Sequence, residues 1–242
     1  PNKQIPTGGI MQIEYIPTWG ICKAKRVFLR TAKFPFLFRM GYNTTSYALY
    51  PERGFCLMKN IIVTGCNGQL GIAVNKLLGE NEEYHLVDTD VSDQGFVKVD
   101  RKLDITNVEE VLNFTKEVKP YAIINCAAYT AVDAAETHLD LNYRINAIGP
   151  RNLAIAATEN QAKLVHISTD YVFPGTSEKP LTEFDPTGPK SVYGITKLAG
   201  ENFVKDFARN YFIIRTAWLY GEGKNFVRTM LKVAETHDEV TV

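Results

Sequence analysis

The chain has 242 residues, of which 45% are apolar, and its formal net charge at pH 7 is zero. This length suits one large domain or two small ones, and the apolar content is sufficient for a buried core. The sequence has no run of eighteen apolar residues, so we expect no membrane span. The neutral charge gives no reason to expect a nucleic acid partner.

The cysteines and histidines do not form a metal-binding pattern. Cys22, Cys56, Cys66 and Cys126 show no CxxC spacing, and the histidines are scattered along the chain. Zinc sites need such ligands in clusters. We therefore predict no metal site, and we interpret the thiols as reduced, as in a cytoplasmic protein.

Residues 1–57 differ from the rest of the chain. They carry eight basic residues against two acidic ones, and glycine and proline interrupt them repeatedly. A basic N-terminus is typical of targeting segments, but no apolar stretch with a small-residue cleavage site follows here. We interpret residues 1–57 as an extension that is poorly ordered or not part of the native protein, and residues 58–242 as the folded domain.

From Met58 onward, apolar strands alternate with helical segments. Strands are expected at residues 59–64, 84–88, 121–126, 163–168 and 211–216, with another beginning at 240–242. Helices are expected at 68–78, from a capping box at 106–109 to before Pro120, at 131–160 with Pro150 as a potential break, at 193–206 and at 225–236. This alternation predicts a doubly wound parallel sheet of the Rossmann type, which binds ligands at the carboxyl ends of its strands.

A glycine-rich turn follows the first of these strands, at residues 64–71 with the sequence TGCNGQLG. Gly65 would permit a tight turn, Gly68 would let backbone N–H groups approach a phosphate, and Gly71 would let the next helix pack closely. Glycines at this spacing are a weak signal alone, and an ordinary helix-capping turn is the alternative. Between a strand and a helix, they predict a dinucleotide pyrophosphate site.

Asp88 ends the second expected strand, 23 positions after Gly65. A carboxylate there accepts hydrogen bonds from the adenine ribose and repels a 2′-phosphate, which favours NADH over NADPH. Arg101 and Lys102 weaken this inference because they are close in sequence. A turn-forming role for Asp88 beside Asp90 is the structural alternative.

A second motif, Tyr193-Gly194-Ile195-Thr196-Lys197, places a phenol and an ammonium on one face of a helix. An ammonium nearby stabilises the phenolate and lowers the pKa of tyrosine, which suits general acid catalysis. Thr169, at the end of the fourth strand, would polarise the same substrate oxygen. Alone, such a helix pair is usually a solvated surface feature. In this order along the chain, the groups predict a nucleotide-dependent oxidoreductase.

Residues 58–242 resemble the extended short-chain dehydrogenase/reductases, and among them the dTDP-4-dehydrorhamnose reductase family. The matching strings are VTGCNGQLG at 63–71, NCAAYTAVD at 125–133, STDYVF at 168–173, YGITKLAGE at 193–201 and RTAWLYG at 215–221. The resemblance implies reduction of the 4-keto group of dTDP-4-dehydro-L-rhamnose by NADH or NADPH. It leaves a homodimer open.

The resemblance also assigns roles to residues. It implies Tyr193 as the acid, Lys197 as its partner and Thr169 as the hydroxyl group. Asp170 and Trp218, with Thr169, would contact the sugar. The dinucleotide would be bound by Gly65, Asn67, Gly68, Gln69, Leu70, Gly71, Asp88, Asp104, Ile105, Ala128, Tyr129, Thr130, Tyr193 and Lys197.

Two departures from the family pattern limit this transfer. Some members bind magnesium through a glutamate on the first helix, and Ala73 aligns there, so no metal is expected. The family's chains also continue past residue 242, so we expect a chain truncated at its C-terminus, with the substrate lobe largely missing.

Two other functions stay open. A related nucleotide-sugar epimerase or dehydratase would use the same tyrosine and lysine, although Thr169, Asp170 and Trp218 favour the reductase. A non-catalytic, dinucleotide-binding regulatory subunit of a methionine adenosyltransferase is the alternative outside catalysis. The intact Thr169, Tyr193 and Lys197 set argues against it.

Overall fold

The computed structural model describes residues 58–222 and 225–236, together with the backbone of Gln12–Tyr15. The expectations for the remainder of residues 1–57 and for a strand at 240–242 lie outside the described residues. Across the described part of the chain, no helix is both long and apolar enough to cross a membrane.

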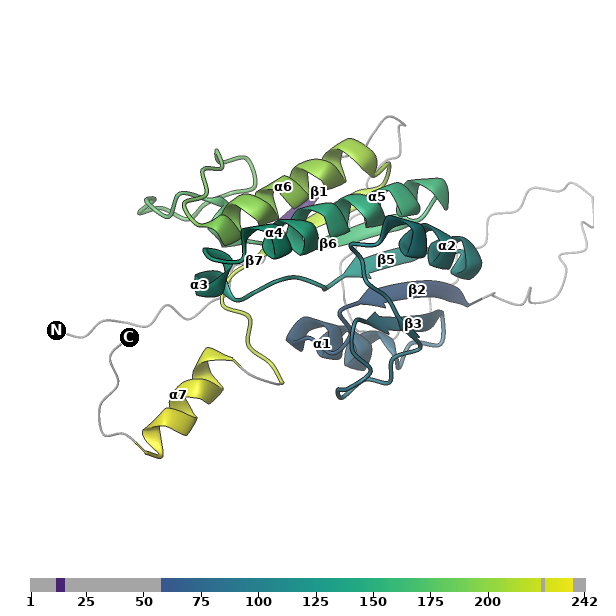
Figure 1. Ribbon diagram of the computed structural model, residues 1–242, viewed down its shortest axis with the longest axis horizontal. Helices are drawn as coiled ribbons and strands as arrows, with labels where there is room; N and C mark the ends of the chain where they lie inside the picture. Colours follow the sequence, from purple (N-terminus) through teal and green to yellow (C-terminus); the bar gives the residue numbers. More distant parts are fainter. Residues whose placement is uncertain (1–11, 16–57, 223–224, 237–242) are drawn as a thin grey trace, which may run out of the picture. The chain divides into compact units, whose positions relative to one another are not determined.

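A seven-stranded sheet organises the described residues (Figure 1). Its order is β1-β7-β6-β5-β2-β3-β4. In this order, every neighbouring pair from β7 across to β4 is parallel, whereas β1 pairs antiparallel with β7. The expected parallel sheet is therefore confirmed, while β1 and the short β4 are strands that the sequence patterns do not predict. The strands are β1 Gln12–Tyr15, β2 Lys59–Thr64, β3 Tyr84–Asp90, β4 Arg101–Lys102, β5 Ala122–Asn125, β6 Lys163–Thr169 and β7 Tyr211–Thr216.

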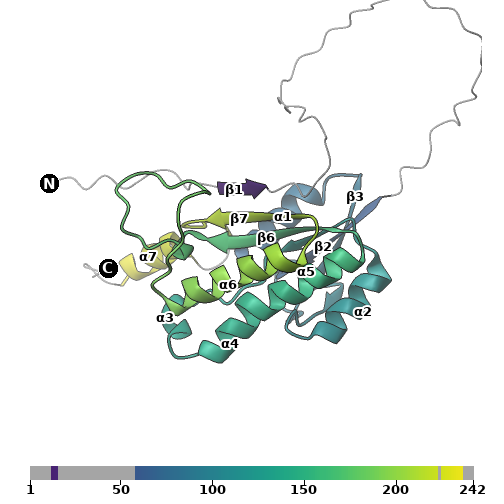
Figure 2. The ribbon, with the colours of Figure 1, turned by 90° about the horizontal axis from the view of Figure 1, so that it is seen from above.

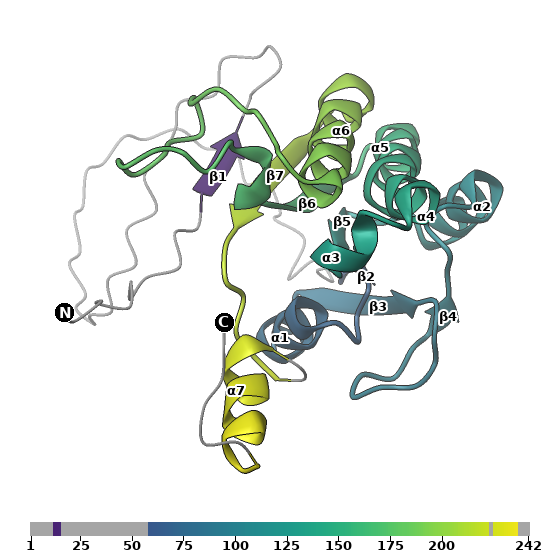
Figure 3. The ribbon, with the colours of Figure 1, turned by 60° about the vertical axis from the view of Figure 1, so that its left-hand side comes forward.

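Helices cover both faces of this sheet. Figures 2 and 3 show α2, α5 and α6 on one face and α1 on the other. This is the doubly wound arrangement, which follows because each parallel connection must cross a face of the sheet. The helical segments are α1 Gln69–Leu78, α2 Val108–Val118, α3 Val132–Ala135, α4 Leu139–Tyr143, the π-helical η1 Arg144–Ile148, α5 Gly149–Glu159, the 3₁₀ turn η2 Asp170–Val172, α6 Val192–Phe207 and α7 Phe226–Ala234.

Strand β2 shows how the sequence supplies two cores. Successive side chains of a strand point to opposite faces, and Ile62 belongs to the larger core, with Leu153 of α5. Ile61 and Val63 belong to a second core, packed against side chains that include Val74 of α1. Both faces of β2 are therefore buried, as its continuous apolar sequence indicates.

The expected helix at 131–160 is wrong as a continuous α-helix. It is broken after α3, and the remainder runs from α4 through η1 into α5. Pro150 occupies the first turn of α5. Proline lacks an N–H group and its ring collides with the preceding turn. The π-helical segment before Pro150 accommodates the proline within the helical run. In it, Gly149 N donates to Arg144 O, five residues earlier.

The capping box expected at 106–109 is displaced by one residue. Asn107 is the N-cap of α2, and its side chain accepts a hydrogen bond from Glu110 N at 3.3 Å. Thr106 N instead donates to Asp104 Oδ1 at 2.9 Å. Asparagine caps a helix at least as well as threonine, so the sequence around Thr106 offers two competing caps.

The order of the sheet fixes where a ligand binds. Strand β2 has β3 on one side and β5 on the other, so the chain reverses its winding direction between β2 and β5. Such a switch point creates a crevice at the carboxyl edge. A buried polar chain marks this edge: Thr64 Oγ1 donates to Asn125 Oδ1 at 2.7 Å, and Asn125 Nδ2 lies 3.0 Å from His166 Nδ1.

Replacing Leu153 with alanine tests the larger core. The Leu153 side chain is 0% exposed, so removing it should lower the free energy of unfolding by about 2–5 kcal/mol. The control is Leu77→Ala on α1, where leucine is 77% exposed and little change is expected. Equal effects of the two substitutions in urea denaturation would contradict this description of the core.

Candidate active site

The glycine turn after β2 lies against the segment that follows β5. Gly65 has a φ of +65°, and a Cβ on it would lie 2.7 Å from the backbone of Ala127. A Cβ on Gly71 would lie 2.3 Å from Gly65 O. Because real Cβ atoms do not approach so closely, both positions require glycine. The turn therefore brings the N-terminus of α1, capped at Gly68, to the carboxyl edge.

A cavity of about 510 Å³ lies at this edge, beside the switch point between β2 and β5. Its volume falls within the range of small-molecule and cofactor sites. Six of the expected dinucleotide residues line it: Gly65, Asn67, Gly68, Asp104, Ile105 and Ala128. The other lining residues were not expected from the sequence: Asp90, Val91, Leu103, Thr106, Cys126, Ala127, Leu141, Arg144 and Ile145. The other eight expected dinucleotide residues do not line it: Gln69, Leu70, Gly71, Asp88, Tyr129, Thr130, Tyr193 and Lys197.

The expected end of β3 is wrong by two residues, and this changes which carboxylate faces the cavity. The strand continues to Asp90. Asp88 is buried, and its Oδ1 accepts a hydrogen bond from Asn75 Nδ2 of α1 at 2.7 Å. Burial raises the pKa of Asp88, the Asn75 hydrogen bond lowers it, and the Asp100 charge raises it.

Asp90 occupies the position at the cavity edge. Strand β2 ends at Thr64, which pairs with Thr89, so Asp90 lies level with the glycine turn. Asp90 Oδ2 accepts a hydrogen bond from Asn67 N at 3.1 Å. The two acids are two residues apart on one strand, and only the length of β3 distinguishes their positions. A sequence pattern does not fix that length.

Asn67 uses its side chain to hold a neighbouring loop. Its Oδ1 accepts from Val97 N at 2.8 Å, and its Nδ2 donates to Val97 O at 3.1 Å. A Cβ on Gly95 would lie 2.0 Å from Asn67 Oδ1. Asn67 therefore fixes the loop that connects β3 to β4, while its backbone N–H belongs to the glycine turn.

The segment after β5 is anchored by an asparagine that sequence reasoning missed. Asn146 Oδ1 accepts from Tyr129 N at 2.9 Å, and Asn146 Nδ2 donates to Tyr129 O at 3.0 Å. Asn146 Nδ2 also donates to Asn142 Oδ1 at 2.6 Å, and both asparagines are buried. Their spacing of four residues on a helix was the available signal. Thr130 is exposed.

The expected catalytic groups meet at the ends of β6 and α6. Thr169 lies close enough to Tyr193 to lower its pKa. Thr169 Oγ1 also donates to Asp170 Oδ1 at 3.0 Å and accepts from Tyr171 N at 3.2 Å. The rings of Tyr171 and Tyr193 pack edge to face, with centroids 5.6 Å apart. Thr169, Asp170 and Tyr193 are thus brought together, as the motifs predict.

The electrostatics of Tyr193 differ from the expectation that Lys197 lowers its pKa. Burial raises the pKa of Tyr193, and Asp170 and Tyr171 raise it further, while the hydrogen bond with Thr169 lowers it. Lys197 Nζ instead donates to Ile167 O at 2.6 Å. Lys197 is 2% exposed, and its burial lowers its pKa to about 8, against the opposing influence of Glu201 and Cys126.

Trp218, an expected sugar contact, follows β7. It has a φ of +51° and is 66% exposed. Its ring packs edge to face on Phe226 of α7, with centroids 5.7 Å apart. The segment after Trp218 lies near α1, since a Cβ on Gly221 would be 3.7 Å from Gln69 Oε1.

Known proteins are similar to this chain in sequence and fold. A dTDP-4-dehydrorhamnose reductase from Aggregatibacter actinomycetemcomitans is 40% identical over 182 residues, covering 75% of this chain and 59% of the relative. The solved structure of such a reductase from Clostridium acetobutylicum is 53% identical, with a TM-score of 0.69, covering 75% of this chain and 61% of that one. The reductase from Bacillus anthracis, solved in complex with NADP, is 45% identical, with a TM-score of 0.70, covering 76% and 62%.

The chain thus spans about three fifths of the length of these relatives. The model of one family, described as the RmlD substrate binding domain, matches residues 58–242. That match covers more than half of the chain, and the resemblance expected from the motifs is confirmed. The chain belongs to the RmlD substrate binding domain family.

Proposed function

We propose that this chain provides the dinucleotide-binding and catalytic part of a dTDP-4-dehydrorhamnose reductase. It would reduce the 4-keto group of dTDP-4-dehydro-L-rhamnose with a nicotinamide dinucleotide. The observation that carries the proposal is that Thr169, at the end of β6, and Tyr193, at the start of α6, lie together, with Lys197 one helical turn away. The relatives that bear this name, and the relative solved with NADP, support it.

The cavity fits such a cofactor. The backbone at Gly65 and Gly71 has no space for a Cβ, and the N-terminus of α1 offers N–H groups and partial positive charge to a pyrophosphate. Asp104, Ile105 and Ala128 would line the remainder of the dinucleotide site. A bound reduced nicotinamide supplies the hydride for the carbonyl carbon.

The chain's own residues would manage the proton. Tyr193 donates its phenolic proton to the carbonyl oxygen, and Thr169 orients that oxygen through its hydroxyl group. A raised pKa keeps Tyr193 protonated at neutral pH, so the acid is ready before reaction. The Lys197 ammonium, one turn along α6, would bind the dinucleotide. Asp170 and Trp218 would contact the sugar.

Tyr193→Phe removes the proton donor but preserves the ring. Turnover of the keto-sugar should fall by a factor of about 10²–10⁴, because the phenol that serves as general acid is removed. The affinity for the dinucleotide should change little. The assay follows the absorbance of the reduced nicotinamide, and fluorescence titration gives the affinity.

The assay for Tyr193→Phe needs a control and a complete substrate lobe. Tyr220→Phe is the matched control, since Tyr220 is 53% exposed. Because the chain spans about three fifths of its relatives, each variant is assayed both as it stands and joined to the C-terminal part of the Clostridium relative. Wild-type turnover by Tyr193→Phe would refute the assigned acid. Tight dinucleotide binding without turnover in every form would favour the regulatory subunit.

We propose that NADH is the preferred cofactor and that Asp90 causes this preference. Its place on the cavity wall, level with the glycine turn, supports a contact with the adenine ribose and repulsion of a 2′-phosphate. Asp88 would support this site from behind, through Asn75 of α1.

Asp90→Asn should reduce the ratio of NADH to NADPH affinity about tenfold, because it removes a charge-assisted hydrogen bond and the repulsion of a phosphate. Titration with both cofactors measures the ratio. Asp206→Asn, an exposed change on α6, is the control. An unchanged affinity ratio in Asp90→Asn would show that Asp90 does not cause the cofactor preference.

The pH profile tests Lys197. Burial lowers its pKa to about 8, so the ammonium is present below that pH and is lost as the pH rises through it. Turnover at saturating substrate should therefore decline with a midpoint near pH 8. Lys197→Arg keeps its charge and should lose this decline. A wild-type profile that stays flat to about pH 10 would show that the charge is not needed.

A further inference from the structure

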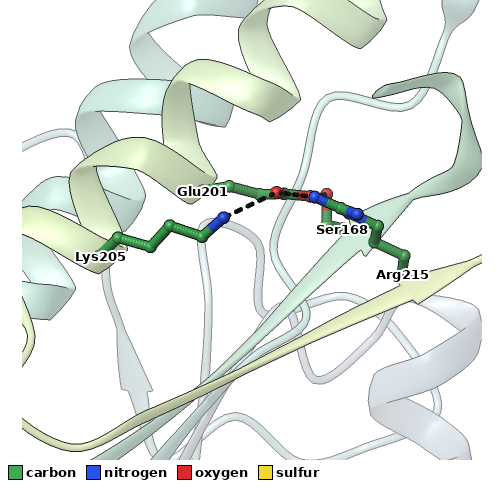
Figure 4. Close-up of polar contacts among 4 residues, drawn as sticks. All are labelled: Ser168, Glu201, Lys205 and Arg215. Carbon is green, nitrogen blue, oxygen red and sulfur yellow. Dashed lines mark hydrogen bonds and ion pairs between the residues drawn. The ribbon is translucent and has the colours of Figure 1, made fainter. Parts of the chain in front are cut away.

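A buried carboxylate lies one helical turn beyond Lys197. Glu201 is 0% exposed, and its Oε1 accepts hydrogen bonds from Ser168 Oγ at 2.6 Å and Arg215 Nε at 2.9 Å. Its Oε2 accepts from Arg215 Nη2 at 2.7 Å. Figure 4 shows this cluster, in which Lys205 Nζ approaches Oε2 at 3.9 Å.

The cluster joins the elements that carry the catalytic groups. Glu201 belongs to α6, four residues after Lys197 and eight after Tyr193, so all three lie along one side of the helix. Ser168 directly precedes Thr169 on β6, and Arg215 on β7 pairs with Ser168. A single carboxylate therefore ties α6 to two strands at the level of the active site.

We propose that Glu201 is a positioning residue for catalysis: its carboxylate fixes α6, which carries Tyr193 and Lys197, against the ends of β6 and β7. This role deepens the proposed function and rests on it. The roles assigned from the sequence do not include Glu201, although it ends the string YGITKLAGE at 193–201.

The free energy of burying charged groups favours a positioning role for Glu201 over a role in stability alone. Burying an ion pair costs as much solvation as the pair regains, and apolar replacements are often equally stable. Arg215 is 5% exposed and lies over the Phe173 ring, 4.9 Å from its centroid. A bidentate pair in this environment contributes orientation, because both partners must keep one geometry.

The surroundings of Lys197 explain how Glu201 would act on it. Burial is the largest influence on the pKa of Lys197 and lowers it, while Glu201 and Cys126 raise it. His166 on β6 also faces Lys197, and burial lowers its pKa so that it stays neutral. Tyr193 lies one turn away and Ile167 O accepts the Nζ hydrogen bond. Without Glu201, the pKa of Lys197 should fall below its value of about 8.

The test measures the titration of Lys197 directly, in the absence of substrate. The chain is labelled with ¹³C at lysine Cε, the Lys197 signal is assigned through Lys197→Arg, and its midpoint is followed with pH by NMR. Glu201→Gln keeps the side-chain volume and removes the charge. The midpoint should fall by about one pH unit or more, whereas Glu201→Asp should stay closer to wild type. Asp206→Asn, an exposed change on the same helix, should leave it unchanged.

A second variant covers the case in which Glu201→Gln does not fold because the buried Arg215 loses its charged partner. The double variant Glu201→Gln with Arg215→Met removes both charges of the pair and is expected to fold. Its Lys197 midpoint should also fall. An unchanged Lys197 midpoint in either folded variant would overturn the proposal. If Glu201 and Arg215 only stabilised the fold, their substitution would lower the melting temperature and leave that midpoint unchanged.

Turnover supplies the second measurement. The decline above neutral pH should move to lower pH in Glu201→Gln, with a loss in kcat and little change in KM. Absence of keto-sugar turnover in the wild type would contradict the proposed function. The NMR titration would still decide the effect of Glu201 on Lys197.

Discussion

The contact between Gly65 and the backbone of Ala127 is the constraint on which the site depends. These segments follow β2 and β5, the strands that flank the switch point of the sheet. A Cβ at Gly65 would lie 2.7 Å from Ala127, so the two segments meet at backbone distance. That closeness places the start of α1 at the carboxyl edge and shapes the cavity. The positive φ of Gly65 shows that the turn is incompatible with most other residues.

The candidate site consists of two chemically different halves. Around the glycine turn, backbone groups and Asp90 surround a cavity suited to a dinucleotide. Around α6, titratable side chains are withdrawn from water. Tyr193 is kept protonated by its burial, and Lys197 is held at a pKa of about 8. Burial thus shifts both pKa values toward uncharged forms, and neighbouring groups oppose the shift for Lys197. This balance suits a proton transfer at neutral pH.

Much of the fold and part of the site could be predicted from the sequence. Apolar runs such as 59–64 identify strands because parallel strands are buried on both faces. The glycine spacing identifies the cofactor edge, and the separation of Tyr193 and Lys197 places them on one helix face. These signals are local. They do not depend on which distant segment packs against them.

The remaining features depend on tertiary contacts that a sequence pattern does not show. Asp90 faces the cavity because β3 continues past Asp88, and that length is set by pairing with β2 and β4. Lys197 donates to Ile167 O because α6 packs against β6. The partnership of Glu201 with Arg215 joins residues fourteen positions apart on different elements. Each is decided by packing and not by local propensity.

The proposed function requires Tyr193 to supply a proton as a sugar ketone is reduced. The most direct measurement is the transfer of deuterium from NADH labelled at the reactive carbon of its nicotinamide to dTDP-4-dehydro-L-rhamnose, read by NMR of the sugar. It is made on the chain as it stands and on the form joined to the C-terminal part of the Clostridium relative. The account predicts one deuterium at carbon 4 of the sugar, and labelling slower by a factor of about 10²–10⁴ with Tyr193→Phe. An unlabelled keto-sugar recovered from both forms, despite saturating NADH binding, would contradict it.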